Sequence, residues 1–279
     1  MLADESLREG RLQEALAQLQ EQVRRNPADA KLRVFLFQLL AVLGQWERAL
    51  IQLNVASELD ASTLGMVAVY REALNCERLR MEVFAGKRTP VVFGEPAEWV
   101  ALLVEALRLT AMGRDSESQT VRARAFEAAP ATGGVLDGQR FEWIADADPR
   151  LGPLLEIIVN GRYYWVPFDR IRRIAVEPPT DLRDLVWSPV AVTWTNGGEA
   201  AGLVPTRYPA SEDSEDSQIR LARRTDWLQR GESLYIGLGQ RMLATDAGEY
   251  PLLEVRAVDL GSDAQAASPA TAADSSAGG

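Results

Sequence analysis

The chain has 279 residues, of which 47% are hydrophobic and 25% are charged, a composition that is ordinary for a globular protein and excludes wholesale disorder. Its 40 acidic and 30 basic residues give a net charge of -10. This charge opposes nonspecific binding to nucleic acid or to an anionic membrane surface, so we expect neither as a partner. The length suits one large domain or two modest ones.

Histidine is absent and cysteine occurs once. The usual general base near neutral pH, the usual zinc ligand and every Ser-His or Cys-His pair are therefore missing. The first residues, MLADE, lack both the positive start and the apolar run of a signal peptide, and no stretch approaches the roughly 20 apolar residues that span a bilayer. We therefore expect a cytoplasmic protein without an internal disulfide.

The N-terminal part of the chain contains a repeat. The segments GRLQEAL and GQWERAL begin at Gly10 and Gly44, which are 34 positions apart. A period of 34 residues is typical of tetratricopeptide repeats, each of which is a pair of helices. Apolar residues within 30–43 recur at spacings of three and four, which predicts a buried helical stripe. The same 34-residue step relates three further pairs: Ala15 and Ala49, Leu16 and Leu50, and Leu19 and Leu53.

The repeat predicts roles for particular residues. Trp46 should be mostly buried between one repeat and the next, and Pro27 should end a helix and direct the chain into another. A single long helix is predicted over about 64–84, and the helical spacing returns over 113–130. The interpretation is a tetratricopeptide-like helical solenoid over residues 1–132.

Beyond this point the composition changes. Over 133–260, Val, Ile, Tyr and Trp gather in short runs bounded by Gly, Pro and Asn, which predicts a mainly β domain and an α+β protein overall. Asn160-Gly161 and Asn196-Gly197 lie between β-prone runs and each predict a hairpin. The acidic, serine-rich segment 211–217 is predicted to be a mobile loop, and 261–279 to be a disordered tail, because it lacks apolar bulk.

No motif predicts a catalytic, metal or cofactor site. The segment GLGQR at 237–241 lacks the third glycine of a dinucleotide-binding loop and is interpreted as a turn. Asp146 and Asp148 precede a proline, as aspartates in turns often do. The aromatic run 163–165 could stack on a base or a sugar, but core packing is the preferred interpretation. Two further features are also interpreted as structural: Cys76 as a buried apolar group, and the arginine pairs 172–173 and 223–224 as solvated or paired with acids.

Six segments, in order along the chain, resemble the ImpE family, also called SciE or TagJ, whose members are accessory proteins of bacterial type VI secretion. The resemblance extends from about Leu2 to Leu260 and is specific, because no common fold requires such long strings. The segments are NPADAKLRVFLFQLLAVLGQWERAL, FAGKRTPVVFGEP, FEWIADADPRLGPLLEIIVNGRYYWVPFDRIRRI, PTDLRDLVW, PTRYP and GLGQRMLATDAGEYPLLEVR.

The resemblance implies a cytoplasmic, non-enzymatic adaptor that binds the N-terminal helix of TssB, the small subunit of the contractile sheath, and is thereby linked to the sheath-disassembling ATPase ClpV. No catalytic residue, metal or cofactor is carried over from the family. Stacked helical hairpins also form a concave surface on which an amphipathic helix can lie by its apolar face. The residues predicted to line that surface are Val34, Gln38, Val42, Arg71, Asn75 and Leu103.

Two other functions are compatible with the sequence. A general peptide-binding scaffold of the tetratricopeptide type would share every feature of the solenoid and would bind some different client. An enzyme that uses carboxylates would need converging acidic side chains in the β-rich domain. For the adaptor itself, the sequence allows the sheath helix to dock either in the helical groove or on the β-rich domain. It also allows the adaptor to assist either sheath assembly or sheath disassembly.

Overall fold

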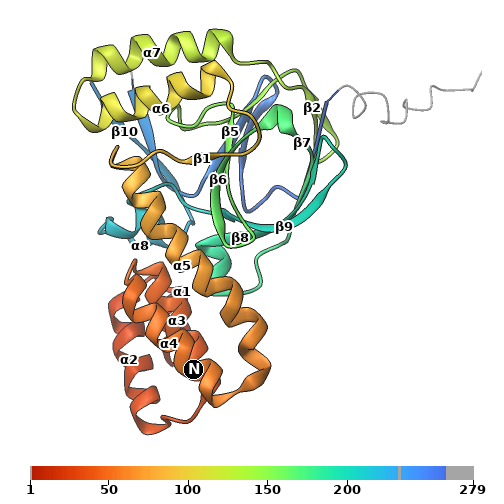
Figure 1. The fold of residues 1–279 in the computed structure, drawn as a ribbon. Helices are drawn as coiled ribbons and strands as arrows, with labels where there is room; N and C mark the ends of the chain where they lie inside the picture. The colour runs from red at the N-terminus through yellow and green to blue at the C-terminus, as the bar shows by residue number, and fades with distance from the viewer. Residues whose placement is uncertain (1, 232–233, 262–279) are drawn as a thin grey trace, which may run out of the picture.

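The structure is a computed structural model that describes residues 2–231 and 234–261 (Figure 1). Its N-terminal part consists of antiparallel helix pairs followed by one long helix. No helix in the described part of the chain is long and apolar enough to cross a membrane. The helices of this part are α1 (Leu2–Arg8), α2 (Leu12–Arg25), α3 (Ala30–Val42), α4 (Trp46–Leu59), the 3-10 turn η1 (Ala61–Thr63) and α5 (Leu64–Phe84).

The 34-residue repeat is a helix-turn-helix unit, as the sequence predicts. Gly10 separates α1 from α2 with φ +79°, and Gly44 separates α3 from α4 with φ +67°. Glycine adopts this left-handed conformation without the steric cost that a Cβ atom brings, and so it ends each first helix. Asp29 caps α3, because its carboxylate accepts hydrogen bonds from the amides of Lys31 and Leu32 at 2.9 and 3.2 Å.

The long helix α5 connects two groups of helices that lie at opposite ends of it (Figure 1). The pairs α1–α2 and α3–α4 lie at its N-terminal end. Helices α6 (Glu98–Ala111) and α7 (Asp115–Ala128) pair with each other beyond its C-terminal end, beside the strands. Before α6 the chain contributes the short strand β1 (Val91–Val92) to the main sheet, where it runs parallel to β6.

The C-terminal part is built from strands. The main sheet has the order β1-β6-β5-β9-β8-β7-β14-β2-β3, and β12 pairs with β4 and β13, while β10 and β11 form a two-stranded ribbon. The strands are β2 (Gly134–Leu136), β3 (Gln139–Phe141), β4 (Ile144–Asp146), β5 (Leu154–Val159), β6 (Arg162–Pro167), β7 (Ile171–Val176), β8 (Trp187–Trp194), β9 (Glu199–Pro205), β10 (Thr225–Arg230), β11 (Leu234–Gly239), β12 (Met242–Thr245), β13 (Gly248–Pro251) and β14 (Ala257–Leu260).

Both predicted hairpins are present. Asn160 and Gly161 have φ of +50° and +71° and join β5 to β6, with Val159 opposite Arg162. These angles fit the two-residue turn that matches the twist of paired strands. The second hairpin joins β8 to β9 through Asn196 to Gly198, where the side chain of Asn196 accepts the Gly198 amide at 2.9 Å. Local turn chemistry therefore fixes the register of the central strands.

Side chains of the main sheet alternate between two cores. On β5, Leu154 and Ile158 belong to a cluster that also contains buried residues of the helices, and we call this cluster the shared core. Leu155, Ile157 and Val159 of the same strand belong to a second cluster, which is formed by the β-rich part. Alternation follows from the period of two along a strand. The helical and the β-rich parts therefore fold against each other through the shared core.

Two expectations from the sequence are wrong in detail. Trp46 is only partly buried, and its ring lies 6.0 Å from that of Trp187 on β8, so it packs against the β-rich part as well as the helices. Residues 211–217 are not a free loop, because they contain the turn η4 (Ser211–Asp213) and pack on the repeat glycines. A Cβ atom on Gly44 would meet the side chain of Glu212 at 2.7 Å.

The predicted boundary at residue 132 stays a prediction. The helices of the N-terminal part end with α7, and most strands follow from β2 onward. However, the strand β1, the short helix α8 (Ser217–Arg220) within the β-rich part and the shared core all extend across this boundary. Of the predicted disordered tail, only Gly261 is among the described residues, and the rest of 261–279 lies outside them.

Candidate functional site

A groove lies where the first helices of the two repeats face the β-rich part. It encloses about 730 Å³, and we call it the inner groove. Helices α1 and α3 form one side, and the segment 179–185 forms the other side. Asp60, which follows α4, and Thr63 of η1 close the groove at one end. Its remaining lining residues are Asp4, Leu7, Arg8, Ala30, Lys31, Val34, Phe35, Gln38, Leu221 and Arg223.

The inner groove has an apolar floor and charged margins. Val34 and Phe35 on α3 are half-buried, and they face Leu182 and Leu185 of the turn η3 (Leu182–Leu185), which are half-buried as well. Apolar side chains that are partly open to solvent in a concave surface are the usual anchors for the apolar face of a helix. The charged residues of the margins are of both signs: Asp4, Asp60 and Asp181, and Arg8, Lys31 and Arg223.

The wall formed by 179–185 is rigidly held. The buried carboxylate of Asp184 accepts the amides of Thr180 and Asp181, each at 2.8 Å, which closes a capping box around η3. The guanidinium of Arg183 lies 4.7 Å from the centre of the Tyr70 ring on α5, a cation–π contact. The wall is therefore fixed to a helix of the solenoid, so the groove is preformed.

Two arginines from the β-rich part bind the C-terminal ends of the groove helices. Arg207 donates to the carbonyls of Val42 and Ala41 at 2.8 and 3.4 Å, at the end of α3. Arg223 donates to the carbonyls of Arg8 and Leu7 at 2.9 and 3.3 Å, at the end of α1. A cation at a helix C-terminus satisfies unpaired carbonyls and complements the helix dipole. These contacts set the position of both helices relative to the strands.

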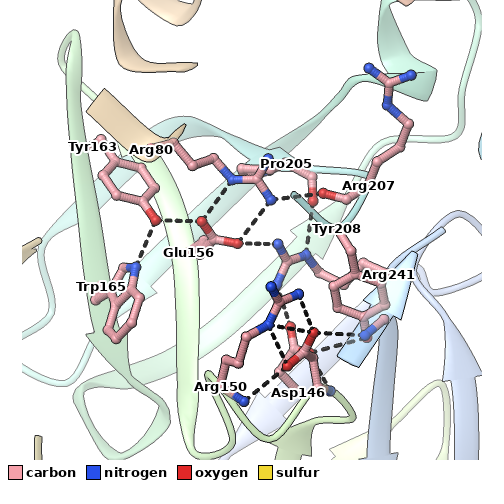
Figure 2. Close-up of polar contacts among 12 residues, drawn as sticks. Arg80, Asp146, Arg150, Glu156, Tyr163, Trp165, Pro205, Arg207, Tyr208 and Arg241 are labelled. Atoms are coloured by element: carbon pink, nitrogen blue, oxygen red, sulfur yellow. Dashed lines mark hydrogen bonds and ion pairs between the residues drawn. The ribbon is translucent and has the colours of Figure 1, made fainter. Parts of the chain in front are cut away.

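A buried ion network lies deeper in the same joint (Figure 2). Glu156 on β5 is 0% exposed and accepts two hydrogen bonds from Arg80 of α5, at 2.8 and 3.1 Å. It also accepts hydrogen bonds from Arg241 and from the hydroxyl of Tyr163. Arg80 additionally donates to the carbonyl of Arg207 at 2.8 Å, while the guanidinium of Arg207 points away from the network toward the helices. The network therefore joins α5 to the strands.

The aspartates of the DADPR segment belong to this network. Asp146 pairs with Arg241, and Asp148 accepts a bidentate contact from Arg150 at 2.5 and 3.0 Å. Asp148 also accepts the amide of Gly237 at 2.8 Å, and the amide of Asp148 in turn donates to Asp146. Each carboxylate is engaged by a guanidinium, so the arrangement is that of a structural joint.

Burial and nearby cations shift the acids of the network in opposite directions. Burial alone would raise the pKa of Glu156, but the adjacent Arg80 and Arg241 guanidinium groups outweigh it and lower that pKa to about 2. Asp146 is equally buried with one guanidinium partner, and burial raises its pKa to about 6. Burial also raises the pKa of Glu77, which accepts the indole N–H of Trp187 at 2.8 Å.

The six predicted lining residues fall into three groups. Val34 and Gln38 line the inner groove. Val42 and Leu103 are 0% and 1% exposed and lie in the shared core. Arg71 and Asn75 are exposed on α5, and Arg71 donates to the side chain of Asn54 on α4 at 2.9 Å. Of the six, the structure therefore brings only Val34 and Gln38 together in the groove. The role of all six in binding stays a prediction.

Sequence reasoning did not find the second wall of the groove. Leu182, Leu185, Leu221 and Arg223 come from the part of the chain that was predicted to be a separate β-rich domain. The only signal was the segment PTDLRDLVW among the family-like strings, which contains 179–185. Its regular Leu and Asp spacing fits one helical turn, but the sequence does not show which surface that turn covers.

The remaining sequence features are structural in this molecule. Gly237 and Gly239 lie in β11, and the adjacent Arg241 belongs to the ion network. Tyr163 and Trp165 are buried, and the indole of Trp165 donates to the Tyr163 hydroxyl at 2.6 Å. Cys76 is buried, which raises the pKa of its thiol to about 12. Within residues 2–231 and 234–261, no group of three or more acidic or Cys side chains is placed to hold a metal ion.

Comparison with known proteins identifies the family. Residues 138–259 match the model of the ImpE protein family, and residues 6–64 match that of the tetratricopeptide repeat. The chain is 53% identical over 260 residues to the type VI secretion system accessory component TagJ of Pseudomonas aeruginosa, a match that covers 93% of this chain and 91% of that protein. The chain belongs to the ImpE family.

A solved structure is similar to this ImpE family chain along nearly its whole length. The crystal structure of protein VPA1032 from Vibrio parahaemolyticus has a TM-score of 0.84 and 28% sequence identity, covering 94% of this chain and 98% of that one. Together with the tetratricopeptide match, this likeness confirms the predicted fold class: a tetratricopeptide-like helical region followed by a sheet-rich domain. The ImpE family chain is thus a homologue of a type VI secretion accessory component.

Proposed function

We propose that this protein is a non-enzymatic adaptor of a bacterial type VI secretion system, and that its inner groove binds the N-terminal helix of the small sheath subunit TssB. The observation that carries the proposal is the open, apolar-floored groove on the first helices of both repeats, in a chain 53% identical to a type VI accessory component. The proposed link to the ATPase ClpV follows from the same contact. In the role that we expect for the family, ClpV disassembles the sheath to which the bound subunit belongs. This role places the protein in the cytoplasm.

Geometry and charge support an amphipathic helix as the ligand. The floor of the groove offers the half-buried Val34, Phe35, Leu182 and Leu185, which would become fully buried beneath the apolar stripe of a helix. The margins carry three acids and three bases, so neither sign of charge dominates. We therefore expect the apolar side chains of the peptide to supply most of the affinity.

The acidic clusters of the β-rich part support binding over catalysis. A carboxylate that acts as a general acid or base must be able to reach a substrate. Asp146, Asp148 and Glu156 are 3%, 0% and 0% exposed, and each contacts an arginine. These are the acids on which an enzyme in this domain would have depended, and here they hold the joint together.

A binding titration with matched variants tests the proposal. Val34→Glu places a charge on the groove floor, whereas Ile51→Glu makes the same change at a 57% exposed position on α4, outside the groove. Isothermal titration with a synthetic peptide of the TssB N-terminal helix should show binding to the wild type and to Ile51→Glu. Val34→Glu should bind about 30-fold more weakly, as for loss of a typical anchor of about 2 kcal/mol. Equal affinity of the two variants would contradict docking in this groove.

A further inference from the structure

A second hollow lies between α5 and the face of β8 and β9 that carries Ala191 and Ala201. It encloses about 590 Å³. Tyr70 separates it from the inner groove, because its ring lines this hollow and also supports Arg183 of the groove wall. The residues that matter for its chemistry are Ala68, Val69, Glu72, Glu177, Ala191 and Ala201.

The walls of this hollow are apolar and uncovered. Val69 on α5 is 51% exposed, and Ala191 and Ala201, which pair across β8 and β9, are exposed too. The neighbouring Val190 and Val192 point to the opposite face and are buried in the strand core. An apolar sheet face is normally covered by another element. Helix α5 covers part of this face, where Tyr70 packs on Trp187 of β8, and leaves Ala191 and Ala201 exposed. The alanines and Gly202 leave space for a helix to approach the sheet closely.

The charge of the hollow is of one sign. Among the described residues that line it, Glu72 and Glu177 are the only acids, and none is a lysine or an arginine. Within the described residues, neither carboxylate forms an ion pair. The inner groove differs in this respect, because its margins carry acids and bases in equal number. An apolar surface flanked by unpaired carboxylates is complementary to an apolar segment flanked by cations.

We propose that the hollow between α5 and β8–β9, which we call the acidic hollow, is a second docking surface, and that its occupant is an amphipathic helix of a partner protein with an apolar face flanked by lysine or arginine. The helix lies on the alanines of the two strands and against Val69, and its cations pair with Glu72 and Glu177. The protein then holds two partner segments at once, one in the inner groove and one in the acidic hollow, as the adaptor of the proposed function requires.

The test uses synthetic helical peptides of about 18 residues that share one Leu/Ala face and differ only in flanks of Lys, Gln or Glu. Fluorescence anisotropy measures their binding to the full chain and to three variants. Ala201→Trp fills the hollow, and Glu72→Lys/Glu177→Lys reverses its charge. Glu58→Lys/Glu127→Lys makes the same change in net charge at exposed positions outside the hollow. Thermal melting of each variant, and its titration with the TssB peptide, verify the fold and the inner groove separately.

The wild type and the Glu58→Lys/Glu127→Lys variant should bind the Lys-flanked peptide at least about tenfold more tightly than the Glu-flanked one. Ala201→Trp should abolish binding, and Glu72→Lys/Glu177→Lys should reverse the preference. Absence of any binding, equal weakening by the two charge reversals, or full binding to a folded Ala201→Trp would each overturn the proposal. Equal binding of all three peptides would also overturn it, because the occupant would then be apolar only.

Discussion

The two ends of α3 meet different surroundings, although they belong to one helix. At its C-terminal end, Leu40 and Val42 are 1% and 0% exposed, and Arg207 of the β-rich part binds the last carbonyls. Toward its N-terminal end, Val34 and Phe35 are half-buried and face the inner groove. The same repeat surface is thus closed by this chain at one end and open at the other.

This difference shows how the concave side of the solenoid is divided. In a solenoid, the first helices of successive repeats line one continuous surface. Here the β-rich part covers a portion of that surface through Arg207, through the segment 211–217 on the repeat glycines and through the wall 179–185. The covered portion builds the joint, and the portion left open keeps apolar side chains for a ligand.

The strongest way to break the closed end is to remove Arg241, which is 0% exposed and pairs with both Asp146 and Glu156. Arg241→Met removes a positive charge that balances the two buried carboxylates. It should therefore lower the free energy of unfolding by about 3 to 5 kcal/mol. Arg173→Met serves as the control, because that arginine pairs with Asp259 at a half-exposed site and should change stability by no more than about 1 kcal/mol. Similar urea midpoints for the two variants would argue against a structural network.

The next prediction compares the loss of stability when each of the two tryptophans of the joint is replaced by alanine. Trp187 is 0% exposed and donates to Glu77, so Trp187→Ala should lower the free energy of unfolding by about 3 to 5 kcal/mol. Trp46 is only partly buried against it, and Trp46→Ala should therefore cost about half as much. Urea denaturation of both variants measures the difference, and a larger loss for Trp46 would contradict the packing described for this joint.

The pH dependence of stability sharpens the account of the network. The folded-state pKa of Glu156 is about 2, below its ordinary value of 4.5, so its stabilising contribution is complete above pH 4.5 and is lost as the pH falls from there toward 2. Asp146 behaves oppositely, because its folded-state pKa of about 6 exceeds the ordinary 3.8. As the pH falls from about 6 toward 3.8, the folded state takes up this proton before the unfolded state does, and the fold becomes more stable.

We therefore expect Glu156→Gln to be less stable than the wild type at pH 7, with the gap narrowing as the pH falls below 4.5. Asp146→Asn should remove a gain in stability that the wild type shows as the pH falls from about 6 to about 4. Urea titrations at a series of pH values give both differences. A gap between wild type and Glu156→Gln that does not change with pH would show that the carboxylate carries no such shift.

The smallest expected effect concerns the end of α1. Arg223→Ala removes the hydrogen bonds to the Arg8 and Leu7 carbonyls, and we expect a loss of about 1 kcal/mol in the free energy of unfolding, typical of a cation at a helix terminus. Because Arg223 also lines the inner groove, peptide affinity should fall slightly as α1 loosens. Arg25→Ala at the exposed end of α2 is the matched control, and an equal loss there would remove the special role of Arg223.

The sequence predicted the parts of the fold that depend on nearby residues. The spacing of Gly10 and Gly44 predicted the helix pairs, because each glycine supplies the left-handed turn of its own repeat. Asn160-Gly161 predicted a hairpin for the same reason. Helical periodicity assigned Val34 and Gln38 to the concave face, and both line the inner groove, while their role in binding stays a prediction.

Contacts between distant segments could not be predicted in this way. The acidic composition of 211–217 suggested a solvated loop, but Glu212 lies against Gly44, 168 positions earlier in the chain. The segments DADPR, YYW and GLGQR were each interpreted as locally structural. The aspartates of the first and two rings of the second are buried, whereas GLGQR, interpreted as a turn, begins inside strand β11. The three segments meet in one ion network because strands of separate sheets come together there, with β5 and β6 in the main sheet and β4 paired with β12. Composition does not specify that arrangement.

The measurement that tests the central claim most directly is isothermal titration of the full chain with the TssB N-terminal peptide at low and high salt. The account predicts saturable binding that Val34→Glu weakens about 30-fold and that Ile51→Glu leaves unchanged. The affinity should depend only weakly on salt, because the floor of the inner groove is apolar and its margins carry balanced charge. No heat at high micromolar peptide, or binding that Val34→Glu leaves unchanged, would contradict the inner groove as the site for this sheath helix.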